Sequence, residues 1–178
     1  PREAVDRLRL ARAEAAAYGS RSVRVFSADT AEGVSRERAF ADAVSGLTSV
    51  GEGFPPLALE NHGTLFDSPS EIDRFLHAVP GLRTTLDAGN YRLRGHDPVP
   101  AIRLLAPAIV NVHLKDFDDR GPTALGEGDH DVCGTVLALR DAGYDGPWTI
   151  ELEMPENADA LVRRSIAFLR ATVGSGER

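Results

Sequence analysis

The feature that most constrains the fold is a regular alternation between short runs of β-forming residues and longer segments with helical spacing. Strands are expected at residues 21–26, 57–61, 82–87, 109–115 and 148–153. Helices are expected at residues 2–18, 35–50, 71–79 with Ser70 as N-cap, 98–105, 135–142 and 157–173. Strands that alternate with helices pair in parallel, because each helix forms a right-handed crossover between two strands. The alternation therefore predicts an α/β fold.

Two architectures fit this alternation, an open doubly wound sheet and a (β/α) barrel. The doubly wound sheet binds phosphates at a glycine-rich turn after a strand, and no G-x-G-x-x-G follows an expected strand. Polar residues end the later strands at a steady interval, with 27 residues from Glu60 to Asp87, 26 from Asp87 to His113 and 38 from His113 to Glu151. One unit of an eight-unit barrel of roughly 250 residues takes about 25–30 residues. The spacing favours a TIM-type barrel, as a single domain over residues 1–178.

The composition suits a globular protein and argues against several partners. With 178 residues, 42% of them hydrophobic, the chain can bury a substantial core. Its net charge of −7 opposes binding to a nucleic acid backbone. No apolar run approaches the length of a membrane span and the first residues lack a signal-peptide layout, so we expect no membrane partner and a cytoplasmic location. The single cysteine, Cys133, excludes an internal disulfide.

The polar strand ends indicate a metal site, because barrel enzymes assemble their active sites at the carboxyl ends of the strands. Two glutamates, one aspartate and one neutral histidine form an oxygen-rich ligand set that suits Mn²⁺, Mg²⁺ or Co²⁺ and would also bind Zn²⁺. A divalent cation that chelates a carbonyl oxygen and the adjacent hydroxyl acidifies the carbon-bound proton between them and stabilises the enediolate. Carboxylates on opposite sides of that carbon could act as base and acid.

Five motifs around these positions carry a resemblance to a known family. They are Leu-Glu-Asn-His-Gly at 59–63, Leu-Asp-Ala-Gly-Asn at 86–90, Val-His-Leu-Lys-Asp at 112–116, Gly-Glu-Gly-Asp at 126–129 and Gly-Tyr-Asp-Gly-Pro-Trp-Thr-Ile-Glu at 143–151. The sequence resembles the sugar-phosphate isomerase/epimerase family of xylose-isomerase-like TIM barrels. The resemblance implies metal ligands at Glu60, Asp87, His113 and Glu151, with Glu60 and Glu151 also serving as the acid/base pair. It implies a metal-dependent isomerase or epimerase of a small sugar or polyol-derived ketose.

Each of these positions also has an ordinary interpretation. Glu60 could be a solvated acid at a strand end, Asp87 could cap the turn into Ala-Gly-Asn, and His113 could be a core histidine. Glu153 competes with Glu151 as ligand, because alternate residues of a strand share a face. The motif favours Glu151.

Further residues near the strand ends are candidates for substrate contacts. Lys115, the only lysine in the chain, shares the face of His113 by alternation, and it forms with Asp116 either a surface ion pair or a pair of substrate contacts. His62 and Asn90 follow ligand positions directly and are expected at the rim of the site as substrate contacts.

The resemblance also implies an incomplete barrel. The family has eight strands, and the strand at residues 21–26 resembles its fourth, so about five strands are expected, corresponding to strands four to eight. Another chain or a second copy could supply the rest, the chain could be cut from a longer protein, or the barrel could be natively incomplete. Alternative functions are a dehydratase using the same metal site and a non-catalytic subunit that binds a partner or dimerises. A DNA-repair endonuclease is disfavoured by the acidic charge and by the presence of only five histidines.

Overall fold

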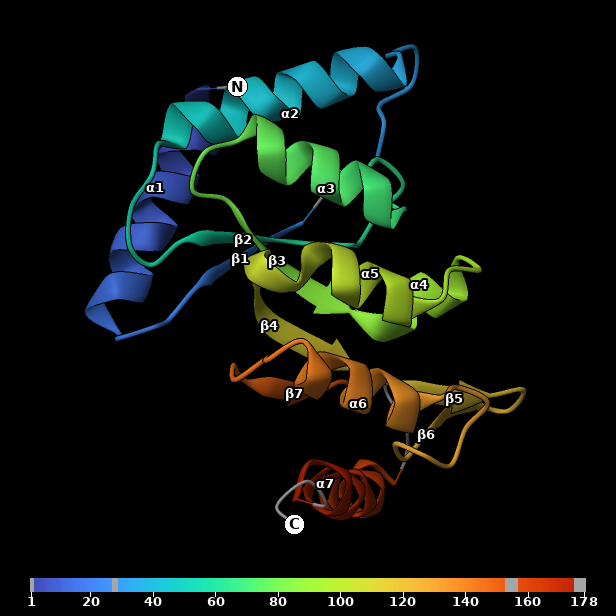
Figure 1. Cartoon of the computed structure of the whole chain (residues 1–178). Coiled ribbons are helices and arrows are strands. Elements are labelled where there is room, and N and C mark those ends of the chain that lie inside the picture. The colour runs from blue at the N-terminus through green and yellow to red at the C-terminus, as the bar shows by residue number, and fades with distance from the viewer. Residues whose placement is uncertain (1, 27–28, 153–156, 175–178) are drawn as a thin grey trace. The chain divides into compact units, whose positions relative to one another are not determined.

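The computed structural model describes residues 2–26, 29–152 and 157–174. Within these ranges, the main sheet has five strands in the order β1 (Val23–Phe26), β2 (Leu57–Glu60), β3 (Arg83–Asp87), β4 (Ile109–Leu114) and β7 (Trp148–Ile150) (Figure 1). The pairs β1–β2, β2–β3 and β4–β7 run parallel. The predicted α/β class with a parallel sheet is confirmed.

Helices separate the strands along the chain, as the alternation predicted. They are α1 (Arg2–Ala17), α2 (Arg36–Val50), α3 (Pro69–Ala78), α4 (Ala88–Leu93), α5 (Pro98–Leu105), α6 (Val132–Asp141) and α7 (Ala158–Gly174), with a short 3₁₀ helix at Ala106–Ala108 (Figure 1). None of the helices in the described ranges is both long enough and apolar enough to cross a membrane.

Several local details differ from the sequence-based expectation. The N-cap of α3 is Ser68 instead of Ser70, because Pro69 takes the first helical turn and the Ser68 hydroxyl accepts from the Glu71 N–H at 3.3 Å. Helix α4 was not predicted, nor was the antiparallel hairpin of β5 (Asp116–Asp118) and β6 (Gly121–Thr123). Strand β7 ends at Ile150, and the alternative ligand Glu153 lies outside the described residues.

The chain divides into two compact units. The first comprises Pro1–Thr85 and Ala108–Val110, and the second comprises Leu86–Pro107 and Asn111–Arg178. Strands β3 and β4 therefore each begin in the first unit and end in the second.

Each unit buries its own apolar side chains. In the first unit, Phe40, Phe66 and Phe75 pack ring against ring, with centroids 4.3–6.0 Å apart. In the second, the fully buried side chains come from strands and helices alike: Leu86, Tyr91, Ile102, Leu105, Val112, Leu114, Val136 and Leu139. The strand ends that carry the candidate ligands thus emerge from packed cores.

Candidate metal centre

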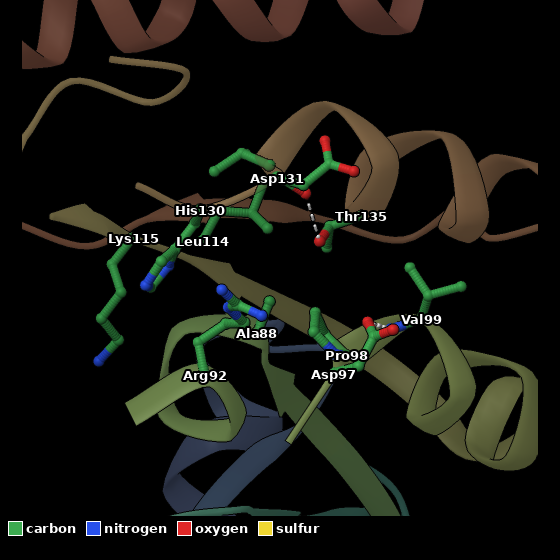
Figure 2. Close-up of a pocket in the computed structure, with 11 residues that line it drawn as sticks. Ala88, Arg92, Asp97, Pro98, Val99, Leu114, Lys115, His130, Asp131 and Thr135 are labelled. Atoms are coloured by element: carbon green, nitrogen blue, oxygen red, sulfur yellow. Dashed lines mark hydrogen bonds between the residues drawn. The ribbon is translucent and has the colours of Figure 1, made fainter. Parts of the chain in front are cut away.

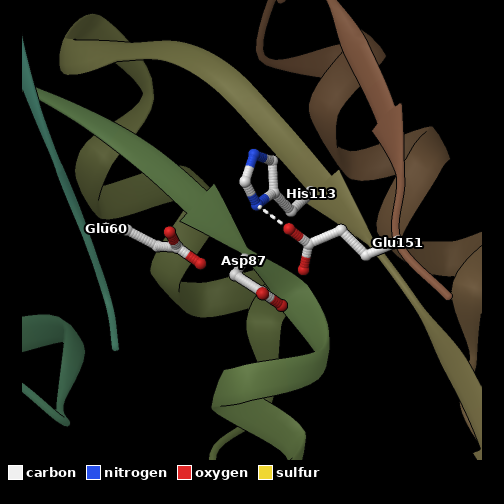
Figure 3. Close-up of side chains that lie close together, drawn as sticks. All are labelled: Glu60, Asp87, His113 and Glu151. Carbon is white, nitrogen blue, oxygen red and sulfur yellow. Dashed lines mark ion pairs between the residues drawn. The ribbon is translucent and has the colours of Figure 1, made fainter. Parts of the chain in front are cut away.

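Strands β3, β4 and β7 are neighbours in the sheet order, and each carries an acid or a histidine at or near its carboxyl end. These strand ends belong to the second unit. Asp87 is the last residue of β3, His113 is in β4 and Glu151 directly follows β7. One ligand atom from each of these side chains lies within 4.8 Å of the others (Figure 3). Asp87 and His113 are buried, whereas the Glu151 side chain is 25% exposed. The backbone fixes Glu151 here, because its N–H donates to the Leu114 carbonyl at 2.9 Å.

Both ring nitrogens of His113 have a polar neighbour. Nδ1 lies 2.8 Å from Oε1 of Glu151, and Nε2 lies 3.0 Å from the side-chain amide nitrogen of Asn111. The hydrogen bond with His113 lowers the pKa of the Glu151 carboxyl to about 2, so this group is a carboxylate at neutral pH. Asn111 was not singled out from the sequence, although its position two residues before His113 on one face of the strand was a signal.

Lys115 bridges the two carboxylates of the centre. Its Nζ lies 2.9 Å from Oδ2 of Asp87 and 3.1 Å from Oε2 of Glu151. Burial disfavours the charged lysine, but the attraction of Asp87 and Glu151 outweighs it and raises the pKa of the ammonium. Gly89 makes room for this side chain, since a Cβ at position 89 would overlap the Cγ of Lys115.

Asp87 caps a helix and also faces the centre. Its Oδ1 accepts from the Asn90 N–H at 2.9 Å at the start of α4, and its Oδ2 faces Lys115. Burial raises the pKa of Asp87 to about 6, against the opposing effect of the Lys115 ammonium. The capping role considered from the sequence is therefore present, and it leaves one carboxylate oxygen directed at the centre.

These residues fit a divalent cation. Two neighbouring ligand atoms of an octahedral ion such as Mg²⁺, each about 2.0–2.1 Å from it, lie about 3 Å apart because their directions are perpendicular. The 2.8 Å separation between Nδ1 of His113 and Oε1 of Glu151 matches that spacing. The two carboxylates also face the ammonium of Lys115, so their oxygens are directed at a positive charge.

Glu60 and His62 belong to the first unit. Glu60 is the last residue of β2, is only 1% exposed and lies 3.1 Å from the Arg24 guanidinium, an environment unlike that of a solvated strand-end acid. His62 is exposed, and its ring lies edge-on to Phe26 with centroids 5.2 Å apart. In the second unit, Asn90 is buried in the first turn of α4, directly after the Asp87 cap.

Asp116 holds the loop after the hairpin through backbone hydrogen bonds. Its carboxylate accepts from the N–H groups of Phe117, Gly126, Gly128 and His130 at 2.9–3.3 Å. A Cβ at Gly128 would overlap this carboxylate, which explains the glycine in the Gly-Glu-Gly-Asp motif. Asp116 therefore fixes the conformation of the loop that follows the hairpin.

Two cavities of the second unit adjoin Lys115. One of about 180 Å³ lies among the starts of α4, α5 and α6 and is lined by Arg92, Asp97, Lys115, His130 and Asp131, among others (Figure 2). The other, of about 230 Å³, is lined by Leu93, Lys115, Asp116, Phe117, Asp118, Gly121, Pro122 and Glu151. The second cavity reaches a candidate ligand directly. The hairpin that forms part of its wall was not predicted from the sequence.

The chain is similar to solved α/β barrels. A xylose isomerase domain protein from Planctomyces limnophilus is 23% identical with a TM-score of 0.73, over 96% of this chain and 64% of that one. The IOLI protein, solved with a bound zinc atom, is 16% identical with a TM-score of 0.79, over 96% of this chain and 69% of that one. An L-ribulose 3-epimerase is 18% identical with a TM-score of 0.79, over 97% of this chain and 67% of that one.

The chain thus spans about two thirds of the length of these structures. No curated protein matches the sequence. A family model for the xylose isomerase-like TIM barrel matches residues 1–172, nearly the whole chain. The parallel strands of the sheet, which end in a group of acids and a histidine, agree with this match. The chain therefore belongs to the xylose isomerase-like TIM barrel family.

Proposed function

We propose that this chain forms the metal-binding part of a divalent-metal-dependent isomerase or epimerase that acts on a small sugar or polyol-derived ketose. The observation that carries the proposal is the convergence of Asp87, His113 and Glu151 from three strand ends within 4.8 Å. Two structural neighbours, an L-ribulose 3-epimerase and a D-tagatose 3-epimerase-like protein, support a carbohydrate substrate.

Glu60 is proposed as the fourth ligand. In the parallel register Glu60 pairs with Thr85, and Asp87 lies two residues beyond Thr85 on the same strand. Partners in register and alternate residues of a strand share a face of the sheet, so Glu60 and Asp87 are expected to point to the same side. Four such ligands suit Mn²⁺, Mg²⁺ or Co²⁺, and the zinc in the IOLI protein shows that a neighbour with this fold holds a divalent metal.

The reaction proposed is proton transfer at the carbon next to a ketone. The ion, when bound, supplies positive charge that polarises the carbonyl and stabilises the enediolate oxygen. Glu151, a carboxylate at neutral pH, removes the carbon-bound proton and becomes the carboxylic acid. As the proposed partner acid, Glu60 donates a proton to the opposite face of that carbon and becomes the carboxylate, which inverts the centre.

The substrate contacts are proposed on the same face as the ligands. Lys115 and Asn90 are buried beside Asp87, within reach of a substrate oxygen, and His62 follows Glu60 by two residues. Asp116 contributes by fixing the loop beside the cavity that Glu151 lines.

The test combines solvent-isotope exchange with metal binding. The protein is loaded with Mn²⁺ or Co²⁺ and incubated in D₂O with a panel of ketopentoses and ketohexoses, and deuterium at the carbon beside the ketone is followed by proton NMR. We expect exchange with at least one sugar, and a loss of at least about 100-fold in Glu60→Gln and Glu151→Gln, since acid–base groups contribute about 10²–10⁴-fold.

Glu32→Gln is the matched control, because Glu32 is an exposed acid in a turn. It should bind metal and exchange deuterium as the unmodified chain does. Full exchange activity in both Glu60→Gln and Glu151→Gln would refute the proton-transfer mechanism, and absence of metal binding would refute the site itself.

Two alternatives use the same structure differently. A dehydratase would expel a β-hydroxyl from the enolate, and one structural neighbour is a probable 3-DHS dehydratase from Bacillus anthracis. The sugar panel separates dehydration from epimerisation, because dehydration gives an unsaturated product.

A non-catalytic subunit would use the edge strand β1, whose Phe26 is 55% exposed, to bind a partner or a second copy. A monodisperse monomer in light scattering would count against that alternative.

A further inference from the structure

We infer that Asn111 sets the tautomer of His113, and that the Asn111 side-chain amide turns over when the centre takes up a metal ion. The inference rests on the metal centre proposed above. Asn111 and His113 lie two residues apart in β4, so their side chains share a face of the strand. The amide nitrogen of Asn111 is 3.0 Å from Nε2 of His113, and both residues belong to the second unit.

In the metal-free chain, the hydrogen bonds around Asn111 determine which ring nitrogen of His113 carries the hydrogen. An amide nitrogen can only donate, so Nε2 of His113 accepts from Asn111 and carries no hydrogen. The hydrogen of the neutral ring is then on Nδ1, which lies 2.8 Å from the Glu151 carboxylate. Behind Asn111, the Thr149 hydroxyl donates to its Oδ1 at 3.3 Å. The metal-free network therefore protonates the nitrogen that faces Glu151.

Metal binding requires the opposite arrangement. A ligating imidazole nitrogen must offer its lone pair, and Nδ1 is the nitrogen that faces the carboxylate of Glu151. Once Nδ1 loses its hydrogen, the neutral ring carries one on Nε2, and this N–H needs an acceptor. Asn111 provides that acceptor only if its Oδ1 takes the place of its Nδ2.

Thr149 can partner the Asn111 amide in either orientation. After the amide turns, Nδ2 of Asn111 points to the Thr149 oxygen, and a hydroxyl accepts as readily as it donates. No charge is created or buried in the process. Asparagine can partner His113 with and without metal, because a half turn of its side-chain amide exchanges the donor nitrogen for the acceptor oxygen. Asn111 therefore acts as a positioning residue for the ligand His113.

The first test reads the tautomer directly. The protein is labelled with ¹⁵N-histidine, and the imidazole nitrogens of His113 are observed without metal and after saturation with Zn²⁺. We expect hydrogen on Nδ1 without metal and on Nε2 with Zn²⁺, together with a shift of the Asn111 side-chain amide signals. Hydrogen already on Nε2 in the metal-free protein would overturn the inference. A failure to bind Zn²⁺ would instead refute the metal centre.

Variants separate this role from simple packing. Asn111→Leu removes donor and acceptor at similar volume, and the Zn²⁺ dissociation constant should rise about 10–100-fold, the usual effect of losing a partner of a ligating histidine. Asn111→Asp offers acceptors only, so it should place hydrogen on Nε2 in the metal-free protein and bind Zn²⁺ at least as tightly as asparagine does.

The control is Asn157→Leu, at an exposed position before α7, which should leave the tautomer and the Zn²⁺ affinity unchanged. Equal weakening of Zn²⁺ binding by Asn111→Leu and Asn111→Asp would overturn the inference, because packing disruption does not discriminate between them.

Discussion

The position of the Lys115 ammonium depends on a neighbour that has no side chain. Gly89 lies in the first turn of α4, where the helix passes against the Lys115 methylene groups. Lys115 is 9% exposed, and its charge is balanced by Asp87 and Glu151. The absence of a Cβ at residue 89 therefore lets the ion pairs form, since any larger residue would push the lysine stem away.

Gly89→Ala is expected to destabilise the protein although alanine favours helices. The penalty for inserting a methyl group into packed atoms, about 1–3 kcal/mol, exceeds the helix gain of about 1 kcal/mol. Urea denaturation should show a lower free energy of unfolding. Gly46→Ala in α2 is the matched control, because nothing lies within 4 Å of its added Cβ, and it should be neutral or stabilising. Equal stability of the two variants would contradict the close packing.

The sequence predicts which residues lie at the strand ends, but not how their polar atoms pair. Asp87 and His113 were found because each ends a run of β-forming residues at a regular interval. The contacts of Lys115 with Asp87 and of Thr149 with Asn111 join residues far apart in the chain. Such pairs depend on strand register and side-chain conformation, which a local pattern does not contain.

Elements are joined by specific side chains as well as by the sheet. In the first unit, Arg36 at the start of α2 donates to the carbonyls of Thr64 and Leu65 at 2.7 and 3.0 Å. It also pairs with Asp67 at 3.1 Å and Glu71 at 2.6 Å. Arg36 thereby ties α2 to the segment that leads into α3.

Arg36→Met should destabilise the protein by about 1–2 kcal/mol. This is less than the ~1.5–3 kcal/mol usual for hydrogen bonds to a charged group, because the Arg36 side chain is 42% exposed and water screens its charge. Burial disfavours the charged form of Asp67, but hydrogen bonding with Glu71 and attraction by the positive Arg36 outweigh this effect. Together they lower the pKa of Asp67. A lowered pKa gives stability that is present above the unfolded value of 3.8 and lost as the pH falls below it. Urea denaturation at pH 7 and pH 3 should show a smaller difference between variant and parent at pH 3.

Arg38→Met provides the control, since its pair with Asp42 is a solvent-exposed i,i+4 contact. The change should alter stability by less than about 1 kcal/mol at either pH. A pH-independent effect of Arg36→Met would mean that Arg36 acts through the two carbonyls alone.

The helices and strands that were missed are short and polar. Ala-Gly-Asn after Asp87 has the composition of a turn, yet the Asp87 cap begins helix α4 there. The two strands of the β5–β6 hairpin hold two aspartates, a glycine and a proline, with none of the alternation that marks a strand. Tertiary hydrogen bonds through Asp116 stabilise this region in place of intrinsic propensity.

At the scale of the whole molecule, metal binding is expected to add to the stability of the folded chain. Asp87, His113 and Glu151 are in the second unit, and Glu60 is in the first. With Glu60 as the proposed fourth ligand, one bound ion would contact the ends of β2, β3 and β4 and the residue after β7. Binding at about 100 times the dissociation constant would add about 2.7 kcal/mol.

Hydrogen–deuterium exchange should show which of these strands a bound ion protects. Adding Mn²⁺ is expected to slow amide exchange near Asp87, His113 and Glu151 and also in residues 57–60 of β2. In Glu60→Gln the protection of β2 should disappear, while part of the protection in the second unit remains. Protection of the second unit alone in the unmodified chain would remove Glu60 from the ligand set.

The burial of Lys115 has a consequence for chemical labelling. Because it is the only lysine in the sequence, the chain offers amine-directed reagents one ε-amino group, and that group is bound by two carboxylates of the candidate centre. Acylation or reductive methylation of a lysine here can therefore report only on the interior of the site. The outer surface carries its fixed positive charge on arginine guanidinium groups, which such reagents leave unmodified.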